Sequence, residues 1–259
     1  MTLVSLNIGL YLLSALLLLA HLFKKGQKWW LPLSYISIFS ALGLHAISLS
    51  YQLSIGDLEV ISAIEALSLA SIMMVLLIIP YLKRHLNTAI AIMLFAGATQ
   101  ILTLFDHQDV GFSTPSPWLS LHILTSIIAY AILLLASVQA LLLYLRDRAL
   151  KNRRSITQKF PPILRMELLL FRMLTIGFIL LTVSLVTSFA FFDQWFSPHF
   201  IHKTVLTGLA WILYGAILWA HHYYGLRGRP AAKFILLTAV ILLLGITGTR
   251  LIQEFLFAS

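Results

Sequence analysis

The side chains of this sequence that can do chemistry are a few imidazoles and charged groups set within long apolar runs. His122 lies about a turn inside the run that begins at Pro117, and His45 lies within an earlier run. An imidazole inside an apolar helix is costly unless another group holds it, so such residues are functional candidates by default. His122 is the first candidate, with a structural contact between helices as the alternative.

Other polar groups within the apolar runs lie toward the same predicted face of the membrane. His45 and Glu65 lie ten residues on either side of Ile55. At about 1.5 Å per helical residue they reach a similar depth, so the two side chains can meet. That contact would be part of a site or a structural bond between helices. Gln100 is typical of a polar residue that joins helices.

Histidines near one face of an apolar chain that has no cysteine suit haem as the cofactor. Haem is flat and largely apolar, takes imidazole as an axial ligand and carries propionates that basic side chains can bind. We predict His122 as an axial ligand and Lys203 and Arg250 as propionate partners, unless these two are only interfacial anchors. Trp118, at the predicted headgroup boundary, completes this set.

Several classes of function are not expected. The sequence shows no nucleophile–base–orienter triad, no glycine-rich phosphate loop and no pair of catalytic carboxylates, so we do not expect an enzyme. The net charge of +9 comes from basic residues in short loops between apolar runs, a pattern that sets topology and meets anionic lipid rather than nucleic acid. The lack of cysteine excludes thiol–disulfide chemistry by this chain.

The composition predicts how these residues are positioned. The 259 residues are 60% hydrophobic and 10% charged, and the mean hydropathy is +0.94. We expect an all-α integral membrane protein with a single membrane domain, because only helices and closed barrels span lipid and the apolar runs are continuous. The first run is expected to be a retained span rather than a signal peptide. The eight expected spans are 3–23, 31–53, 58–82, 89–105, 117–145, 167–192, 203–223 and 232–255.

Basic residues follow every odd-numbered run and are nearly absent after the even-numbered ones. Because basic loops stay in the cytoplasm, this alternation predicts eight transmembrane helices with both termini on the outer, periplasmic side of a bacterial inner membrane. The basic connections contain Lys24, Lys25 and Lys28, then Lys83 and Arg84, then the stretch 146–165, and finally Arg227, Arg229 and Lys233.

Four stretches resemble the CcsA-type cytochrome c assembly proteins. One of them, HKTVLTGLAWILYGAILWAHHYYGLRGRPAAKFILL, is similar to an aromatic-rich span, a cytoplasmic glycine–arginine turn at Gly225–Arg229 and the last span of that family. The sequence WLSLHILTSIIAYAILLLASVQALLLYL is similar to the span of that family whose outer end bears a haem-ligand histidine, with His122 at the matching position. ELLLFRMLTIGFILLTVSLVTS resembles the following span, with its arginine–glycine–phenylalanine pattern at Arg172, Gly177 and Phe178. SAIEALSLAS is more weakly similar to an outer-facing segment, with Glu65 at its acidic position.

The chain departs from the CcsA-type pattern in two places. The stretch FFDQWFSPHFIHK contains Trp195 and Asp193 but not the tryptophan-rich motif, and GITGTR replaces the region of the second family histidine. The chain therefore resembles the YpjD/HemX-like branch of this superfamily. We infer His202, which lies in the altered loop, as the substitute second axial ligand.

The resemblance implies a haem-binding or haem-handling multi-pass protein of the inner membrane that acts in c-type cytochrome assembly. Its expected partners are the lipid bilayer and other proteins of cytochrome c maturation. The alternative is a non-catalytic membrane scaffold or regulator without bound haem.

Overall fold

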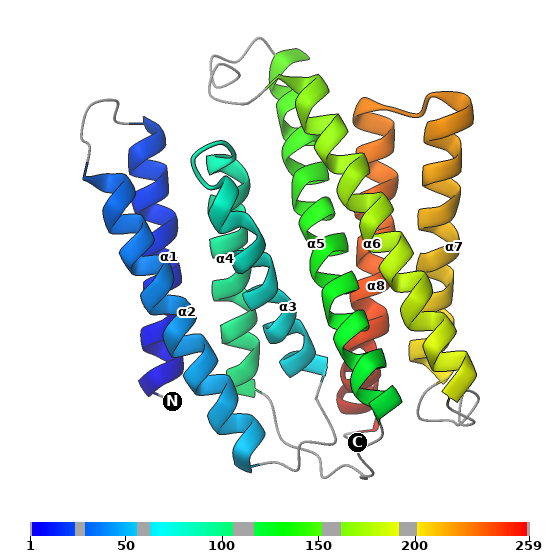
Figure 1. The fold of residues 1–259 in the computed structure, drawn as a ribbon, viewed down its shortest axis with the longest axis horizontal. Helices are drawn as coiled ribbons and strands as arrows, with labels where there is room; N and C mark the ends of the chain where they lie inside the picture. The colour runs from blue at the N-terminus through cyan, green and yellow to red at the C-terminus, as the bar shows by residue number, and fades with distance from the viewer. Residues whose placement is uncertain are drawn as a thin grey trace. The chain divides into compact units, whose positions relative to one another are not determined.

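The computed structural model describes residues 2–23, 29–55, 63–105, 117–151, 162–191 and 201–257. Side chains are described for residues 3–23, 29–50, 64–104, 121–151, 162–190 and 204–245. Helix is the only regular secondary structure in these ranges, so the predicted all-α class is confirmed there (Figure 1). The chain divides into two compact units, Met1–Pro115 and Ser116–Ser259. We describe each unit by itself, and the single membrane domain stays a prediction.

Unit 1 contains four antiparallel α-helices (Figure 1). Helix α1 packs against both α2 and α4, and α3 packs mainly against α4. At Gly97 of α4, an added methyl group would lie 3.6 Å from Cβ of Tyr11 on α1, so the two backbones are close. The elements are α1 (Thr2–Phe23), α2 (Trp30–Ile55), α3 (Ala63–Ile78), η1 (Ile79–Tyr81), α4 (Leu86–Leu102) and η2 (Thr103–Phe105).

The turn between α3 and α4 forms at one proline and a short basic stretch. Pro80 lies in the first turn of η1, where its missing amide proton removes no helical hydrogen bond. His85 then caps the start of α4, and its carbonyl accepts from the amide of Ala89 at 2.9 Å. Burial lowers the pKa of His85, and the positive charge of Arg84 lowers it further. The imidazole is therefore neutral at pH 7 and adds nothing to the positive charge of this turn.

Unit 2 is built around α5 (Pro117–Lys151), which packs against α6 (Ile163–Phe191) and α8 (Gly228–Phe257). Helix α7 (Ile201–Tyr224) packs mainly against α8. In the apolar 18-residue segment of α5, 72% of the residues are buried. This is the largest share for any candidate membrane span in the described residues. The long apolar run identified in the sequence is thus the central helix of its unit.

Small residues bring α5 and α6 close together. A methyl group added at Gly177 of α6 would lie 2.7 Å from Cγ and Cδ2 of Leu133 on α5, which is closer than carbon atoms can pack. Leu133 is fully buried, so the added group would have to displace a packed side chain. Membrane helices associate through such close contacts because lipid chains are as apolar as leucine and provide no hydrophobic drive.

The turn from α7 to α8 depends on two glycines. Gly225 and Gly228 have φ angles of 65° and 63°, a left-handed backbone that glycine adopts without steric cost. Within this turn the amide of Leu226 donates to the carbonyl of Ala220 at 3.2 Å. The turn therefore holds the end of α7 and the start of α8 side by side.

Seven of the described helices are long and apolar enough to cross a membrane. The remaining helix, α4, is apolar but has 17 residues, fewer than the roughly 20 of a typical span. The observed helices match the expected runs to within six residues at each end where both are described, and the largest difference is at the end of α5. The full count of eight spans and the outer location of both termini stay predictions.

Candidate functional site

His122 is bound to the backbone of the neighbouring helix in unit 2. Its ring atom Nδ1 lies 3.0 Å from the carbonyl oxygen of Ser184 on α6. A carbonyl oxygen only accepts hydrogen bonds, so Nδ1 must carry the proton and donate it. In the neutral imidazole, Nε2 is then the basic nitrogen. An Nδ1–H to carbonyl hydrogen bond of this kind is the usual way that proteins orient a histidine ligand of a metal.

Hydroxyl groups reinforce this contact between α5 and α6. Ser126 lies one turn after His122, and its Oγ is 2.6 Å from Oγ of Ser184. The same Ser126 hydroxyl is 2.6 Å from the carbonyl oxygen of His122. Both serines are at least 91% buried. The imidazole itself is half-buried.

The helices place the other predicted haem residues in the same unit. The start of α8 contacts the start of α6 and the end of α5, so the start of α5 and the ends of α6 and α8 lie at the opposite end. Helix α7 is antiparallel to α8 and also starts at that end. Trp118, His202 and Lys203 are in the first turns of α5 and α7, and Arg250 is two turns from the end of α8. Their side chains lie outside the described residues.

His45 is the centre of a separate polar cluster in unit 1. Its Nδ1 lies 2.9 Å from the hydroxyl of Tyr11 on α1. Its Nε2 lies 2.7 Å from Oγ of Ser68 on α3 and 2.7 Å from Nε2 of Gln100 on α4. Gln100 also accepts a hydrogen bond from Asn7 of α1 at 3.1 Å. We call these five residues the His45 cluster; each is at least 99% buried.

The His45 cluster joins four helices through one imidazole. Because both ring nitrogens are already in hydrogen bonds, iron could bind His45 only if one of these bonds were broken. The geometry thus favours the structural alternative, with Ser68 as the partner on α3, one turn beyond Glu65. Glu65 is 93% buried. Participation of His45 and Glu65 in haem binding stays a prediction that this structure does not test.

Sequence reasoning identified Gln100 as a residue that joins helices but missed three members of the His45 cluster. Asn7 and Tyr11 are four residues apart and therefore share one face of α1, a spacing that could have drawn attention to both. Ser68 offered no such signal, because serine is common in membrane helices and bonds equally well within its own helix. Ser184 was missed for the same reason.

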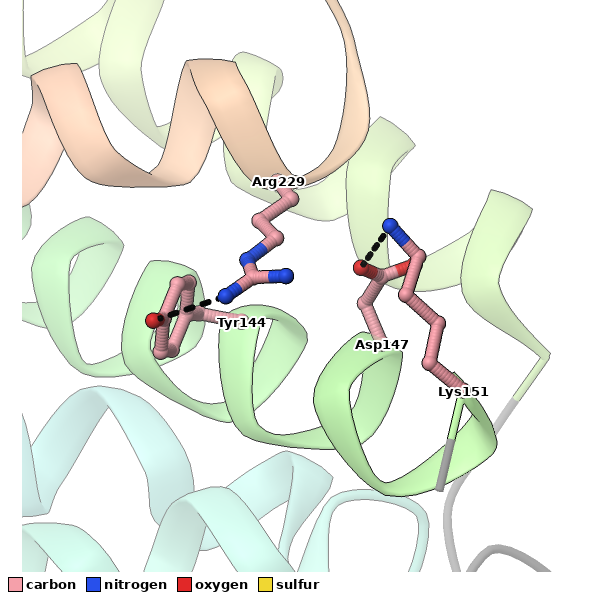
Figure 2. A network of polar contacts seen from close by, with 4 residues as sticks. All are labelled: Tyr144, Asp147, Lys151 and Arg229. Atoms are coloured by element: carbon pink, nitrogen blue, oxygen red, sulfur yellow. Dashed lines mark hydrogen bonds and ion pairs between the residues drawn. The ribbon is translucent and has the colours of Figure 1, made fainter. Parts of the chain in front are cut away.

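The opposite end of unit 2 carries charged side chains whose contacts are mainly structural (Figure 2). The guanidinium of Arg229 donates to the hydroxyl of Tyr144 at 3.2 Å and lies 4.9 Å from the centre of that ring. Lys151 pairs with Asp147 one turn away at 3.7 Å. Exposed pairs of this kind contribute little stability. The residues described contain no group of three metal-binding side chains.

Comparison with known proteins places the chain in a family. The family described as Cytochrome C assembly protein matches residues 30–257, which include both His45 and His122. The Inner membrane protein YpjD of Escherichia coli K12 is 31% identical over 252 residues, covering 95% of each chain. An uncharacterized 28.8 kDa protein of Azospirillum brasilense is 32% identical over 146 residues, covering 55% of this chain and 54% of the relative.

These matches agree with the resemblance that was found in the sequence alone. The Escherichia coli relative is described as an inner-membrane protein, and the apolar helices of both units confirm the predicted multi-pass location. The match to the family covers well over half of the chain. The chain is therefore a member of the cytochrome c assembly protein family.

Proposed function

We propose that this protein binds and handles haem during c-type cytochrome assembly, with Nε2 of His122 as an axial ligand of the iron. The observation that carries the proposal is the hydrogen bond from Nδ1 of His122 to the Ser184 carbonyl. This hydrogen bond requires the ring proton on Nδ1, so that Nε2 is the basic nitrogen of the neutral imidazole. Membership of the family supports the same assignment.

The donor set in unit 2 fits haem. Imidazole is a common axial ligand of haem iron. His202 is the proposed second ligand, Lys203 and Arg250 the proposed propionate partners, and Trp118 an aromatic neighbour at the membrane boundary. All four belong to the end of unit 2 at which α5 begins. When bound, haem would be the cargo of the protein, and we propose no bond-making step and no enzymatic role.

The partners follow from this role. We propose that the lipid bilayer surrounds the apolar helices and that the haem passes to or from other proteins of cytochrome c maturation. The task of the chain would be to hold the haem near the outer leaflet.

The test is a titration of the detergent-purified protein with haemin, followed by the Soret band. In His122→Ala we expect haemin affinity to fall by at least about tenfold, since even a residue that only orients a metal ligand contributes about 10- to 100-fold. His222→Ala is the matched control, because His222 is an exposed imidazole at the far end of α7. The control should bind haemin as the unmodified protein does.

A rescue experiment separates ligand loss from misfolding. His122→Gly should lose the Soret signal and regain it when free imidazole is added, since the small molecule can occupy the vacated ligand position. An unchanged Soret band in His122→Ala would contradict the proposal.

A further inference from the structure

A cavity of about 450 Å³ lies at the basic end of unit 2, away from the predicted haem residues. It is bounded by the first turns of α6, the last turn of α7 and the connection to α8. We infer that this cavity binds the phosphate headgroup of an anionic phospholipid, whose acyl chains lie along the exposed apolar face of α6. This inference is independent of haem binding.

The walls of the cavity are fixed by contacts that need no ligand. The ring of His221 stacks on Phe171 with 3.4 Å between centroids and 10° between planes. Its Nδ1 donates to the carbonyl of Leu226 at 2.8 Å. The carboxylate of Glu167 accepts a hydrogen bond from the amide of Gly228 at 2.5 Å. These contacts link α6 to both sides of the α7–α8 turn, so the cavity is preformed.

The charge of the cavity suits one phosphodiester. Arg172 and Arg227 line it, and both are exposed residues. Among the described residues, neither guanidinium is joined to a carboxylate by an ion pair. Glu167 is the acidic residue of the lining, so two positive charges and one negative charge leave a formal charge of +1. Guanidinium groups bind phosphate oxygens in a planar, bidentate geometry, which favours a phosphate over other anions.

The surface beside the cavity is suited to acyl chains. Leu164, Leu168 and Ile176 are on the wall formed by α6 and are 62%, 53% and 52% exposed. An apolar surface that begins next to two arginines at the end of a membrane helix matches a lipid in shape and polarity. Basic pockets at the cytoplasmic ends of membrane helices are known to bind anionic headgroups. The basic loops predict that this end faces the cytoplasm, where anionic lipids are enriched.

The test is native mass spectrometry of the intact protein, released from detergent with phosphatidylglycerol or phosphatidylcholine. We expect the unmodified protein to retain phosphatidylglycerol in preference to phosphatidylcholine. The double variant Arg172→Gln and Arg227→Gln should retain at least about fivefold less phosphatidylglycerol, the effect of one basic residue at an anionic surface. Lys233→Gln is the matched control, because Lys233 is an exposed basic residue at the same end of unit 2 that does not line the cavity.

A variant with the opposite expected sign excludes misfolding as the cause. Glu167→Gln keeps an oxygen that can accept from Gly228 and raises the formal charge of the cavity to +2. It should retain more phosphatidylglycerol, by about fivefold. Inorganic phosphate added in excess should not displace the lipid, since it lacks the chains that contact α6; displacement would indicate a phosphate site instead.

Three further results would overturn the inference. One is equal lipid retention by the double arginine variant and the unmodified protein. Another is an equal loss in Lys233→Gln, which would indicate attraction to the whole basic surface. The third is loss of haemin binding in the double variant with phosphatidylglycerol retained, which would assign the cavity to haem.

Discussion

The imidazoles of His45 and His122 both lie within membrane helices of this protein, and their surroundings differ. His122 uses one ring nitrogen to bond a backbone carbonyl, an arrangement that orients the other nitrogen. His45 uses both nitrogens to join three other helices. The first arrangement suits ligand binding, whereas the second suits stability. The two residues therefore should respond differently to substitution.

His45→Ala should destabilise the protein by about 2 kcal/mol, since interhelical hydrogen bonds in membranes contribute about 0.6 kcal/mol on average and buried partners left unsatisfied add to the loss. The measurement is the free energy of unfolding in mixed detergent and sodium dodecyl sulfate, followed by circular dichroism. Ser50→Ala is the control, because the exposed Ser50 hydroxyl bonds only to its own helix. Equal stability of both variants would show that the His45 cluster does not hold unit 1 together.

At the scale of the helices, the glycine and the phenylalanine of the α6 pattern each pack against a neighbouring helix. Gly177 allows α5 to approach closely, and Phe178 stacks on Trp211 of α7 with 5.8 Å between ring centroids. The indole of Trp211 also donates to the hydroxyl of Thr182 at 2.8 Å. Two neighbouring residues of α6 thus face two different helices, which places α6 between α5 and α7.

Gly177→Ala should destabilise the protein by about 1–3 kcal/mol, because the added methyl group would overlap the buried side chain of Leu133. Gly208→Ala in α7 is the matched control, since nothing lies within 4 Å of a methyl group there. The control should change stability by less than about 0.5 kcal/mol. Both can be measured by the same unfolding titration, and a neutral Gly177→Ala would mean that α5 and α6 are less closely packed than described.

At the scale of the whole chain, the alternating basic loops predict eight spans with both termini on the outer side. The native chain has no cysteine, so single-cysteine variants can be labelled without background. In intact spheroplasts, Thr2→Cys should react with a membrane-impermeant maleimide, whereas Lys83→Cys and Arg227→Cys should react only after lysis. Labelling of Lys83→Cys before lysis would overturn the predicted orientation.

The predicted haem residues divide between the two units. Trp118, His122, His202, Lys203 and Arg250 belong to unit 2, whereas His45 and Glu65 belong to unit 1. If haem binding requires only unit 2, then His45→Ala should keep its haemin affinity in the titration that detects the loss in His122→Ala. Loss of affinity in a His45→Ala protein that is still folded would bring unit 1 into the site.

The amino-acid sequence by itself determined the helical class, the approximate bounds of the apolar helices and the family. These properties depend on local hydrophobicity and on motifs within single helices, which a sequence displays directly. Only the tertiary structure decided which nitrogen of His122 carries the proton, that His45 contacts Ser68, and where the cavity beside Arg172 lies. Each of these depends on side chains from helices far apart in the chain, and helical periodicity does not specify which faces of different helices meet.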